Sequence, residues 1–355
     1  MAPNAATSAD SDGRLARAFP DSARHVGQLL ALGAIAGIAA IMVTFLLLYW
    51  LRRFPLWAPA YGIFMASATT VDSVLGINVF RHPFMWHSIA TGVFIGIAAP
   101  LIGTYLVHRE MALIGETLAH TAFAGVAFGI VAVAITGLDV PLLLAALVVA
   151  VLGALGVQWL AERTQTYGDV PIAIMLSGSF AVATLLISYG RGMTGVNIEG
   201  YLFGSLAIVT VEGARTMAIL TVLVVVVIAF TYKQLLFITF DEQAARVAHL
   251  HVDRYNTLLI VLTAVVVVGA MQVMGVILVA AMLVVPVAAA TQVADSFRET
   301  IYLAIIFGEL AIIGGFTLSI YFGLPSGGSI VVVAIALYLL AIGLGGRTTP
   351  ITVNR

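Results

Sequence analysis

Apolar stretches of about 20 residues recur along this 355-residue chain, and a helix needs about that length to cross a bilayer. Hydrophobic residues make up 61% of the sequence and charged residues 9%, whereas a soluble domain carries about 25% charged residues. Because backbone groups in lipid must satisfy their own hydrogen bonds, we expect helices, and the continuous apolar runs lack the alternation of a β-barrel. The sequence therefore predicts an all-α polytopic membrane protein.

We predict about ten transmembrane helices, separated by polar connections. The predicted spans are residues 26–51, 86–107, 114–137, 141–160, 171–189, 217–232, 257–271, 273–293, 301–322 and 329–344. Residues 52–82 are too polar to span, and we expect a short interfacial helix at 61–70. Residues 190–213 predict a loop with a short half-buried helix, and the longest polar stretch of the second half begins at Lys233.

The distribution of Lys and Arg predicts the orientation of the chain. With the N-terminus inside, eleven of the sixteen Lys and Arg residues fall in cytoplasmic segments and five in external ones, in the sense of the positive-inside rule. Both termini and residues 233–254 are then cytoplasmic. Arg52 and Arg53 are exceptions, because they follow the first span on the external side.

Composition excludes several classes of function. The net charge is −1, with no basic patch suited to nucleic acid. Cysteine is absent, which removes disulfides and thiolate metal sites. The first 25 residues lack the apolar core of a signal peptide, so we expect a short disordered tail there. No Gly-x-x-x-x-Gly-Lys-Ser/Thr run occurs, and Lys233 is the only lysine, so the chain has no nucleotide site of its own.

One carboxylate and one imidazole stand within the third predicted span. Glu116 and His120 are four residues apart, so on a helix they share one face, one turn apart. This donor pair suits a divalent cation: imidazole favours zinc and iron, and carboxylate also accepts manganese. Two such helices in a two-fold dimer would supply four ligands, enough for a tetrahedral shell.

The spacing of Glu116 and His120 leaves a second interpretation open. The two side chains could pair with each other, or with a neighbouring helix, and serve only packing. The pair is not a His-Glu-x-x-His protease helix, because Gly115 stands where the first metal-binding histidine would be. No paired acid-base constellation favours a membrane enzyme either.

The other ionisable residues are weaker candidates. His249 and His251 are two residues apart and would face different directions on a helix. Glu309 lies inside the ninth predicted span, where it could face a cavity or pair with a polar group such as Gln272. Three further histidines flank the second span, and we expect them at the membrane interface: His82, His87 and His108.

Residues 237–256 predict a short helix on the cytoplasmic face. Thr239 or Asp241 would cap its start, and Glu242 would lie in its first turn. A helix lodged between two spans offers a docking surface for another protein. An ordinary connecting loop is the alternative.

Four passages, taken together, resemble the permease subunits of bacterial and archaeal zinc, manganese and iron ABC importers. VHREMALIGETLAHTAFAGVAFG (107–129) resembles the Gly-Asp-x-x-x-His segment of that family, and YLFGS (201–205) its Tyr-Leu-Phe-Gly block. FITFDEQAARVAHLHV (237–252) resembles its cytoplasmic Asp-x-x-x-Ala segment. VMGVILVAAMLVVPVAAA (273–290), with LPSGGS (324–329), resembles its C-terminal core.

The resemblance implies a homodimeric permease of type II-like ABC importer architecture. Its partners would be two copies of a cytoplasmic ATPase and an extracellular metal-binding receptor. Glu116 and His120 would meet the metal near the outer gate. Asp241, Glu242 and Ala245 would belong to the coupling helix that contacts the ATPase. The permease core would cover residues 83–346, after a polar cytoplasmic tail (1–25), an extra N-terminal helix (26–51) and an extracytoplasmic connection (52–82), and before a cytoplasmic tail (347–355).

Three features depart from the family pattern. Glu116 replaces an aspartate, which keeps the charge and adds one methylene. His249 stands where a small residue, usually glycine, is expected. The first 80 residues precede the family core.

The sequence thus predicts a plasma-membrane permease subunit for zinc, manganese or iron, which is not itself an enzyme and holds no permanent cofactor. Alternating access would be driven by the ATPase, and the partners would be a second copy, the receptor and membrane lipid, but no nucleic acid. The alternative is a secondary transporter, coupled to protons through Glu116 and Glu309 and acting without an ATPase.

Overall fold

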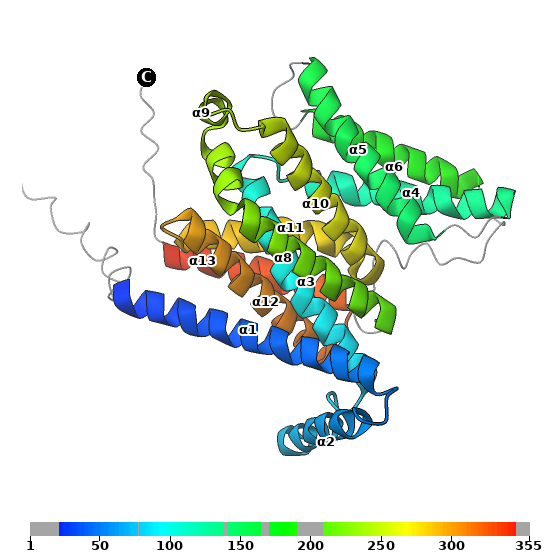
Figure 1. Ribbon diagram of the computed structural model, residues 1–355, viewed down its shortest axis with the longest axis vertical. Coiled ribbons are helices and arrows are strands. Elements are labelled where there is room, and N and C mark those ends of the chain that lie inside the picture. Colours follow the sequence, from blue (N-terminus) through cyan, green and yellow to red (C-terminus); the bar gives the residue numbers. More distant parts are fainter. Residues whose placement is uncertain (1–20, 77, 138–140, 165–169, 190–208, 346–355) are drawn as a thin grey trace, which may run out of the picture.

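The computed structural model describes residues 21–76, 78–137, 141–164, 170–189 and 209–345, all of whose regular elements are helices (Figure 1). The first six are α1 (Asp21–Leu51), α2 (Ala58–Leu75), α3 (Pro83–His108), α4 (Ile114–Thr136), α5 (Leu142–Thr164) and α6 (Val170–Tyr189). The others are α8 (Val211–Phe240), α9 (Glu242–Val247), α10 (Val252–Met274), α11 (Val276–Val293), α12 (Phe297–Phe322) and α13 (Ser326–Gly345). Ten of the helices in these ranges, all except α2 and α9, are long and apolar enough to cross a membrane, which confirms the predicted number of spans.

Several helices extend beyond the spans read from the sequence. α8 runs from Val211 to Phe240, well past the predicted 217–232, and α2 covers 18 residues rather than ten. The apolar pattern marks only the part of a helix that faces hydrocarbon, whereas its hydrogen bonds continue through polar residues at the boundary, such as Arg215 and Lys233. The short helix expected at 190–213 lies largely outside the described residues, as does the block at 201–205.

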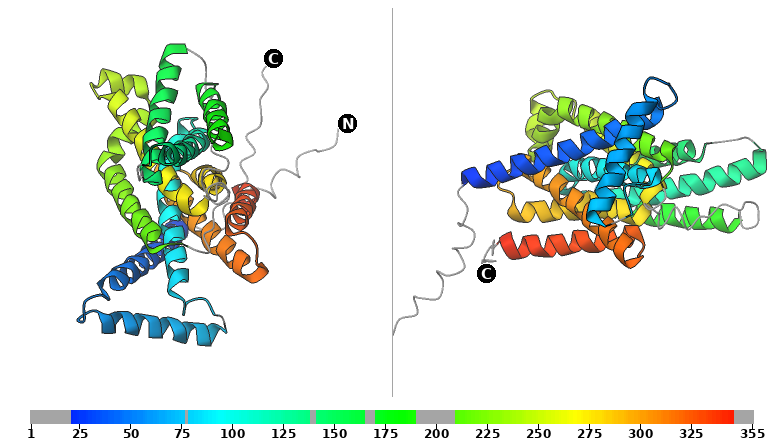
Figure 2. Two further views of the ribbon diagram at one scale, coloured as in Figure 1. Left: turned by 90° about the vertical axis from the view of Figure 1, so that its right-hand side faces the viewer. Right: turned by 90° about the horizontal axis from the view of Figure 1, so that it is seen from below.

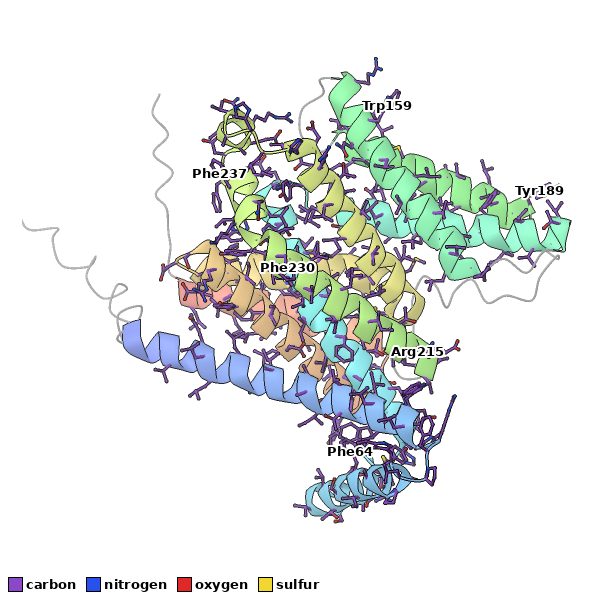
Figure 3. The ribbon with its side chains drawn as sticks, in the orientation of Figure 1. Phe64, Trp159, Tyr189, Arg215, Phe230 and Phe237 are labelled. Atoms are coloured by element: carbon purple, nitrogen blue, oxygen red, sulfur yellow. The ribbon has the colours of Figure 1, made fainter. Side chains whose placement is uncertain are left out.

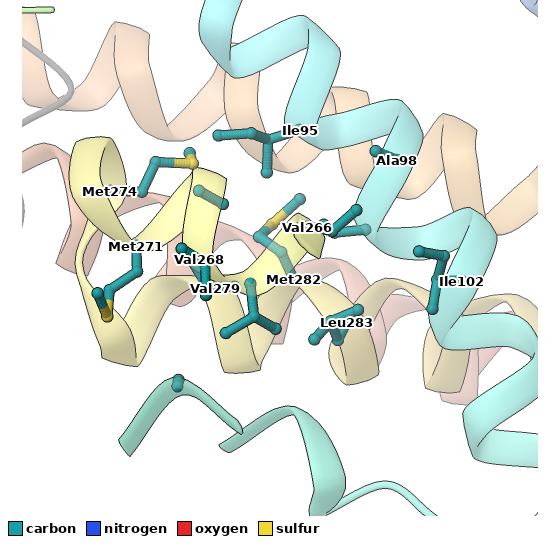
Figure 4. Close-up of a cluster of buried hydrophobic side chains, with 14 of the residues drawn as sticks. Ile95, Ala98, Ile102, Val266, Val268, Met271, Met274, Val279, Met282 and Leu283 are labelled. Carbon is teal, nitrogen blue, oxygen red and sulfur yellow. The ribbon is translucent and has the colours of Figure 1, made fainter. Parts of the chain in front are cut away.

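The core forms around α3, the most deeply buried of the described spans. Figure 4 shows Ile95, Ala98 and Ile102 of α3 facing side chains of α10 and α11. A Cβ atom placed on Gly103 would lie 1.9 Å from the carbonyl oxygen of Leu283, so the backbones of α3 and α11 touch at that point. Small residues allow such close approach between helices in membranes, where van der Waals contact replaces the hydrophobic effect.

α4, α5 and α6 pack together along one side of the molecule (Figure 1). Gly125 of α4 again permits backbone contact, because a Cβ there would lie 2.8 Å from the carbonyl oxygen of Ala145 in α5. Thr121 of α4 fits against Gly153 of α5 in the same way. This packing fixes the rotation of α4 about its own axis, and hence which of its residues face away from α5.

α1 and α2 form an N-terminal unit around the start of α3. α1 runs along the outside of the bundle, against α3 and α12, and α2 lies across the foot of α3 (Figures 1 and 2). At its first end α1 is joined to α12 by a hydrogen bond from Gln28 to the Glu299 carboxylate. At its other end Phe45 is fully buried among the rings of Tyr61, Phe64 and Trp86.

Asp72 ties α2 to the turn that leads into α3. Its carboxylate accepts hydrogen bonds from the backbone N–H groups of Val79, Phe80 and Arg81, at 2.8–3.2 Å, and pairs with the Arg81 guanidinium. Burial acts to raise the pKa of the Asp72 carboxyl, but these donors together hold it below its usual range. The carboxylate thus serves as a structural anchor for the 52–82 connection.

The contact at Gly103 predicts a strong effect of a single methyl group. In Gly103→Ala the Cβ meets the Leu283 backbone, which has no flexible end to move aside, so α3 and α11 must separate. We expect a loss of roughly 1–3 kcal/mol of stability or more, seen as a lower thermal unfolding midpoint in detergent. The matched control is Gly37→Ala in α1, where nothing lies within 4 Å. Equal midpoints for the two variants would contradict the contact.

Candidate functional site

Glu116 and His120 lie in the first two turns of α4, as their spacing predicts. The chain reverses between α3 and α4 in five residues, with Glu110 in the left-handed region at φ 58°. Ile114 and Leu118 then face the core and are fully buried. Glu116 and His120 occupy the neighbouring, half-buried stripe of the same helix.

The two side chains are not satisfied by each other. No hydrogen bond or ion pair joins Glu116 to His120, and the buried Nδ1 atom of His120 has no hydrogen-bond partner among the described residues. The His120 ring meets Phe180 of α6 edge-on, with 5.3 Å between ring centroids. Glu116 stands in the first turn, where the positive end of the helix dipole favours a carboxylate. The carboxylate and the imidazole thus share one half-buried face of α4.

Glu116 and His120 lie near one end of the bundle, the end that adjoins α9. Five residues separate α3 from α4, and the end of α3 adjoins α9, because Arg109 bonds to Thr239 of α8 and Asn256 of α10. Glu116 and His120 therefore lie in the half of the bundle on the α9 side. The expected position near the outer gate stays a prediction, because it depends on which end of the bundle faces the cytoplasm.

One chain supplies too few ligands for a closed metal site here. Among the described residues, no group of three or more His, Asp and Glu side chains is placed to hold one ion. A carboxylate and an imidazole on one helix give at most a partial shell. The remaining ligands of a bound ion would come from a second copy of the chain, from water or from other molecules that accompany the ion.

The predicted cytoplasmic helix is present as α9, and the structure selects its cap. The Asp241 carboxylate accepts a hydrogen bond of 2.8 Å from the backbone N–H of Ala244. The Thr239 hydroxyl instead donates to the Leu235 carbonyl of α8. Ala245 is fully buried against Ile238 of α8 and Val252 of α10. α9 is therefore held against both helices.

Charged residues on α9 join it to α10. Arg246 donates to the Glu242 carboxylate, one turn earlier, and to Asp253 of α10, at 2.8 and 3.0 Å. His249 follows α9 with φ 58°, in the left-handed region that favours glycine. The glycine usual at this position in the family is thus explained by backbone geometry. His249 and His251 are both exposed.

A pocket of about 540 Å³ lies between α9 and the bundle, with Arg109 in its wall. Sequence reasoning did not single out Arg109, although it stands within the VHREM passage. The Nε and Nη1 atoms of Arg109 donate to Thr239 and Asn256. Its third guanidinium nitrogen, Nη2, is buried and has no partner among the described residues. Burial lowers the pKa of the guanidinium, and the nearby Glu242 acts to raise it. Arg109 thus connects the end of α3 to α8 and α10 directly beside α9.

Glu309 and the flanking histidines complete the set of predicted residues. Glu309 is 3% exposed, and neither of its carboxyl oxygens has a hydrogen-bond partner among the described residues. It packs against Gly96 of α3, where a Cβ would lie 2.7 Å from Oε1. The side chain of Gln272, its suggested partner, lies outside the described residues.

His87 is buried within the protein. It is 2% exposed, donates from Nδ1 to the Pro83 carbonyl and packs against Phe45, because α1 and α2 cover this part of α3. His82 is exposed, and His108, half-buried, donates to the Thr104 carbonyl.

Comparison with known proteins agrees with this architecture. Residues 81–345 match the family described as the ABC 3 transport family. The manganese transport system membrane protein MntC of Listeria monocytogenes is 29% identical over 264 residues, which are 74% of this chain and 91% of that protein. The high-affinity zinc uptake system membrane protein ZnuB of Haemophilus influenzae is 26% identical over 258 residues, 73% of this chain and 96% of that protein.

The solved structure of PsaBC from Streptococcus pneumoniae in complex with Fab is similar as well. The identity is 30%, the TM-score is 0.64, and the match covers 74% of this chain and 91% of that chain. The predicted fold, an all-helical ABC permease with about ten spans, is confirmed. The chain is a multi-pass membrane protein that belongs to the ABC 3 transport family.

Proposed function

We propose that this permease subunit carries zinc, manganese or iron across the plasma membrane, as one of two copies that enclose the path. Relatives named for manganese, zinc and iron transport support this range of cargo. The observation that carries the proposal is the pair on α4: Glu116 lies one turn from His120, whose buried Nδ1 atom has no hydrogen-bond partner in the part of the chain that the structure describes. ATP would be hydrolysed by a separate subunit, and an extracellular receptor would deliver the metal.

In this proposal each copy contributes one carboxylate and one imidazole to the passing ion. The half-buried stripe of α4 that carries Glu116 and His120 would face the two-fold axis, so two copies give four ligands. The absence of thiolates and the open shell favour rapid release, which transport requires. Because the pair lies on the α9 side, it would act late in import, between the bundle centre and the cytoplasm.

Coupling would run through α9, with both termini and α9 in the cytoplasm. An ATPase that displaces α9 would also displace α8 and α10, because Ala245 is buried between them and Arg246 reaches Asp253. Arg109 would pass the movement to α3 through Thr239 and Asn256. The chain reversal after α3 would then shift the first turn of α4, where Glu116 lies. Packed helices respond to such shifts by switching between discrete arrangements.

Substitutions at the pair test the metal step. We expect Glu116→Ala and His120→Ala each to lower uptake of radioactive metal into vesicles by an order of magnitude or more, because one ligand of two is lost per copy. Glu116→Asp restores the carboxylate usual in the family and should keep most of the uptake. His251→Ala, which alters an exposed histidine, is the control. Normal uptake at normal expression for both alanine variants would reject the role.

The cap of α9 tests the coupling step. Asp241→Ala removes the side-chain acceptor for the Ala244 N–H, worth about 1 kcal/mol at a helix start. We expect uptake per ATP hydrolysed to fall in the reconstituted complex. Asp241→Asn keeps an acceptor oxygen and should stay close to wild type. An unchanged ratio of uptake to hydrolysis in Asp241→Ala would exclude α9 as the coupling element.

A secondary transporter remains the second candidate, and one observation favours it. Glu309 is a carboxyl group buried within α12 without a hydrogen-bond partner among the described residues, and such groups carry protons in some transporters. The two candidates differ in their need for the ATPase. In vesicles that contain this chain alone, an imposed pH gradient should drive no metal uptake. Uptake there that is lost in Glu309→Gln would establish proton coupling instead.

A further inference from the structure

A pocket of about 240 Å³ lies between the last turn of α1 and the first turns of α8, at the end of the bundle opposite α9. We call it the arginine pocket. Figure 3 shows Arg215, at the start of α8, beside this end of α1. The lining residues are Leu46, Tyr49, Trp50, Arg52, Arg53, Val211, Glu212 and Arg215.

The arginine pocket has an excess of positive charge. It holds three guanidinium groups and a single carboxylate, that of Glu212. Arg81 and Arg246 pair with carboxylates elsewhere, but in the described part of the chain no ion pair satisfies Arg52, Arg53 or Arg215. Guanidinium groups without a carboxylate partner are suited to bind phosphate, because its oxygens match their planar set of hydrogen-bond donors.

One of the three arginines is held in place. The Arg52 guanidinium lies 3.9 Å from the ring centroid of Tyr49 and 5.5 Å from that of Tyr61. Stacking on these rings restricts its rotamers while leaving hydrogen-bond donors free at the guanidinium edge. The pocket is therefore partly organised before any ligand arrives.

The surroundings place the arginine pocket at a membrane boundary. Leu46, Tyr49 and Val211 give it an apolar wall, and Trp50, Phe54 and Trp57 are exposed close by in the chain. Aromatic side chains of this kind gather where headgroups meet hydrocarbon. Val222 and Leu223, two to three turns further along α8, are exposed and apolar, as expected for a lipid-facing surface. A ligand here would have a charged part for the arginines and an apolar part for the wall.

We propose that the arginine pocket binds the phosphate group of an anionic phospholipid and thereby joins α1 to α8. An inorganic phosphate ion would match the guanidinium groups but would make no use of the apolar wall. The matched family segment begins at residue 81, so α1 adds one side of this pocket from outside it. The positive-inside rule disfavours arginines at the end of the bundle that we expect outside, and a lipid-binding role would explain why Arg52, Arg53 and Arg215 stand there.

The bound headgroup would act on the transport machinery through α8. α1 packs against α2, α3 and α12, and the lipid would add a link to the helix whose other end adjoins α9. Anionic lipid would thus stabilise the position of α8 relative to α3. This role is independent of the proposed metal path.

The test measures lipid retention and thermal stability of the full chain. Wild-type protein and Arg53→Gln/Arg215→Gln are placed in nanodiscs of phosphatidylcholine alone or with phosphatidylglycerol. We expect native mass spectrometry to show retained phosphatidylglycerol on the wild type, with affinity reduced on the order of tenfold in the double variant. Phosphatidylglycerol should raise the unfolding midpoint of the wild type but not that of the Arg53→Gln/Arg215→Gln variant.

Arg298→Gln/Arg254→Gln is the control, since it removes the same charge from exposed arginines toward the α9 end. It should behave as wild type. Equal lipid retention by the Arg53/Arg215 variant would overturn the proposal. Equal stabilisation of wild type by inorganic phosphate in phosphatidylcholine would identify a free-anion site instead. Loss of receptor binding without loss of lipid would assign the pocket to protein docking.

Discussion

The rest of the structure depends on the direct contact between the backbones of α3 and α11 at Gly103. In lipid, helices gain little from burying apolar surface against one another, so close van der Waals contact must hold them together. The space at Gly103 brings α11 against α3, and α10 and α12 pack around the same helix. The end of α3 then fixes Arg109, and through the short reversal it fixes the start of α4.

Polar groups are concentrated at the two ends of this apolar frame, and they differ in character. At the α9 end two arginines bridge neighbouring helices: Arg246 pairs with two carboxylates, and Arg109 bonds to Thr239 and Asn256. These bonds link α9 to α10, and the end of α3 to α8 and α10, as the proposed coupling role requires. At the opposite end the Asp72 carboxylate accepts three backbone hydrogen bonds, whereas the arginines of the arginine pocket have no ion pair within the described part of the chain. That end is suited to binding an anion rather than to transmitting force.

Between the ends, ionisable side chains within the spans are few and incompletely satisfied. His120 retains a buried nitrogen without a partner, and Glu309 retains two such oxygens among the described residues. An unsatisfied polar group in a low-dielectric interior costs free energy, so each of them implies an interaction beyond the single chain as described. For His120, the second copy proposed above would supply that interaction. Glu309 packs against Gly96 of α3.

The sequence by itself determined the class of the protein, the number of its spans and the position of Glu116 and His120 on one face of one helix. These follow from local quantities: the length of apolar runs and the 3.6-residue period of a helix. It also narrowed the cap of α9 to two residues. Only the tertiary structure decided that Asp241 is the cap, that His87 is buried and that Arg109 joins three helices. It placed Glu116 and His120 on the α9 side. Depth, burial and partners depend on which distant segments meet, and in a chain where nearly every residue is apolar, hydropathy does not encode that choice.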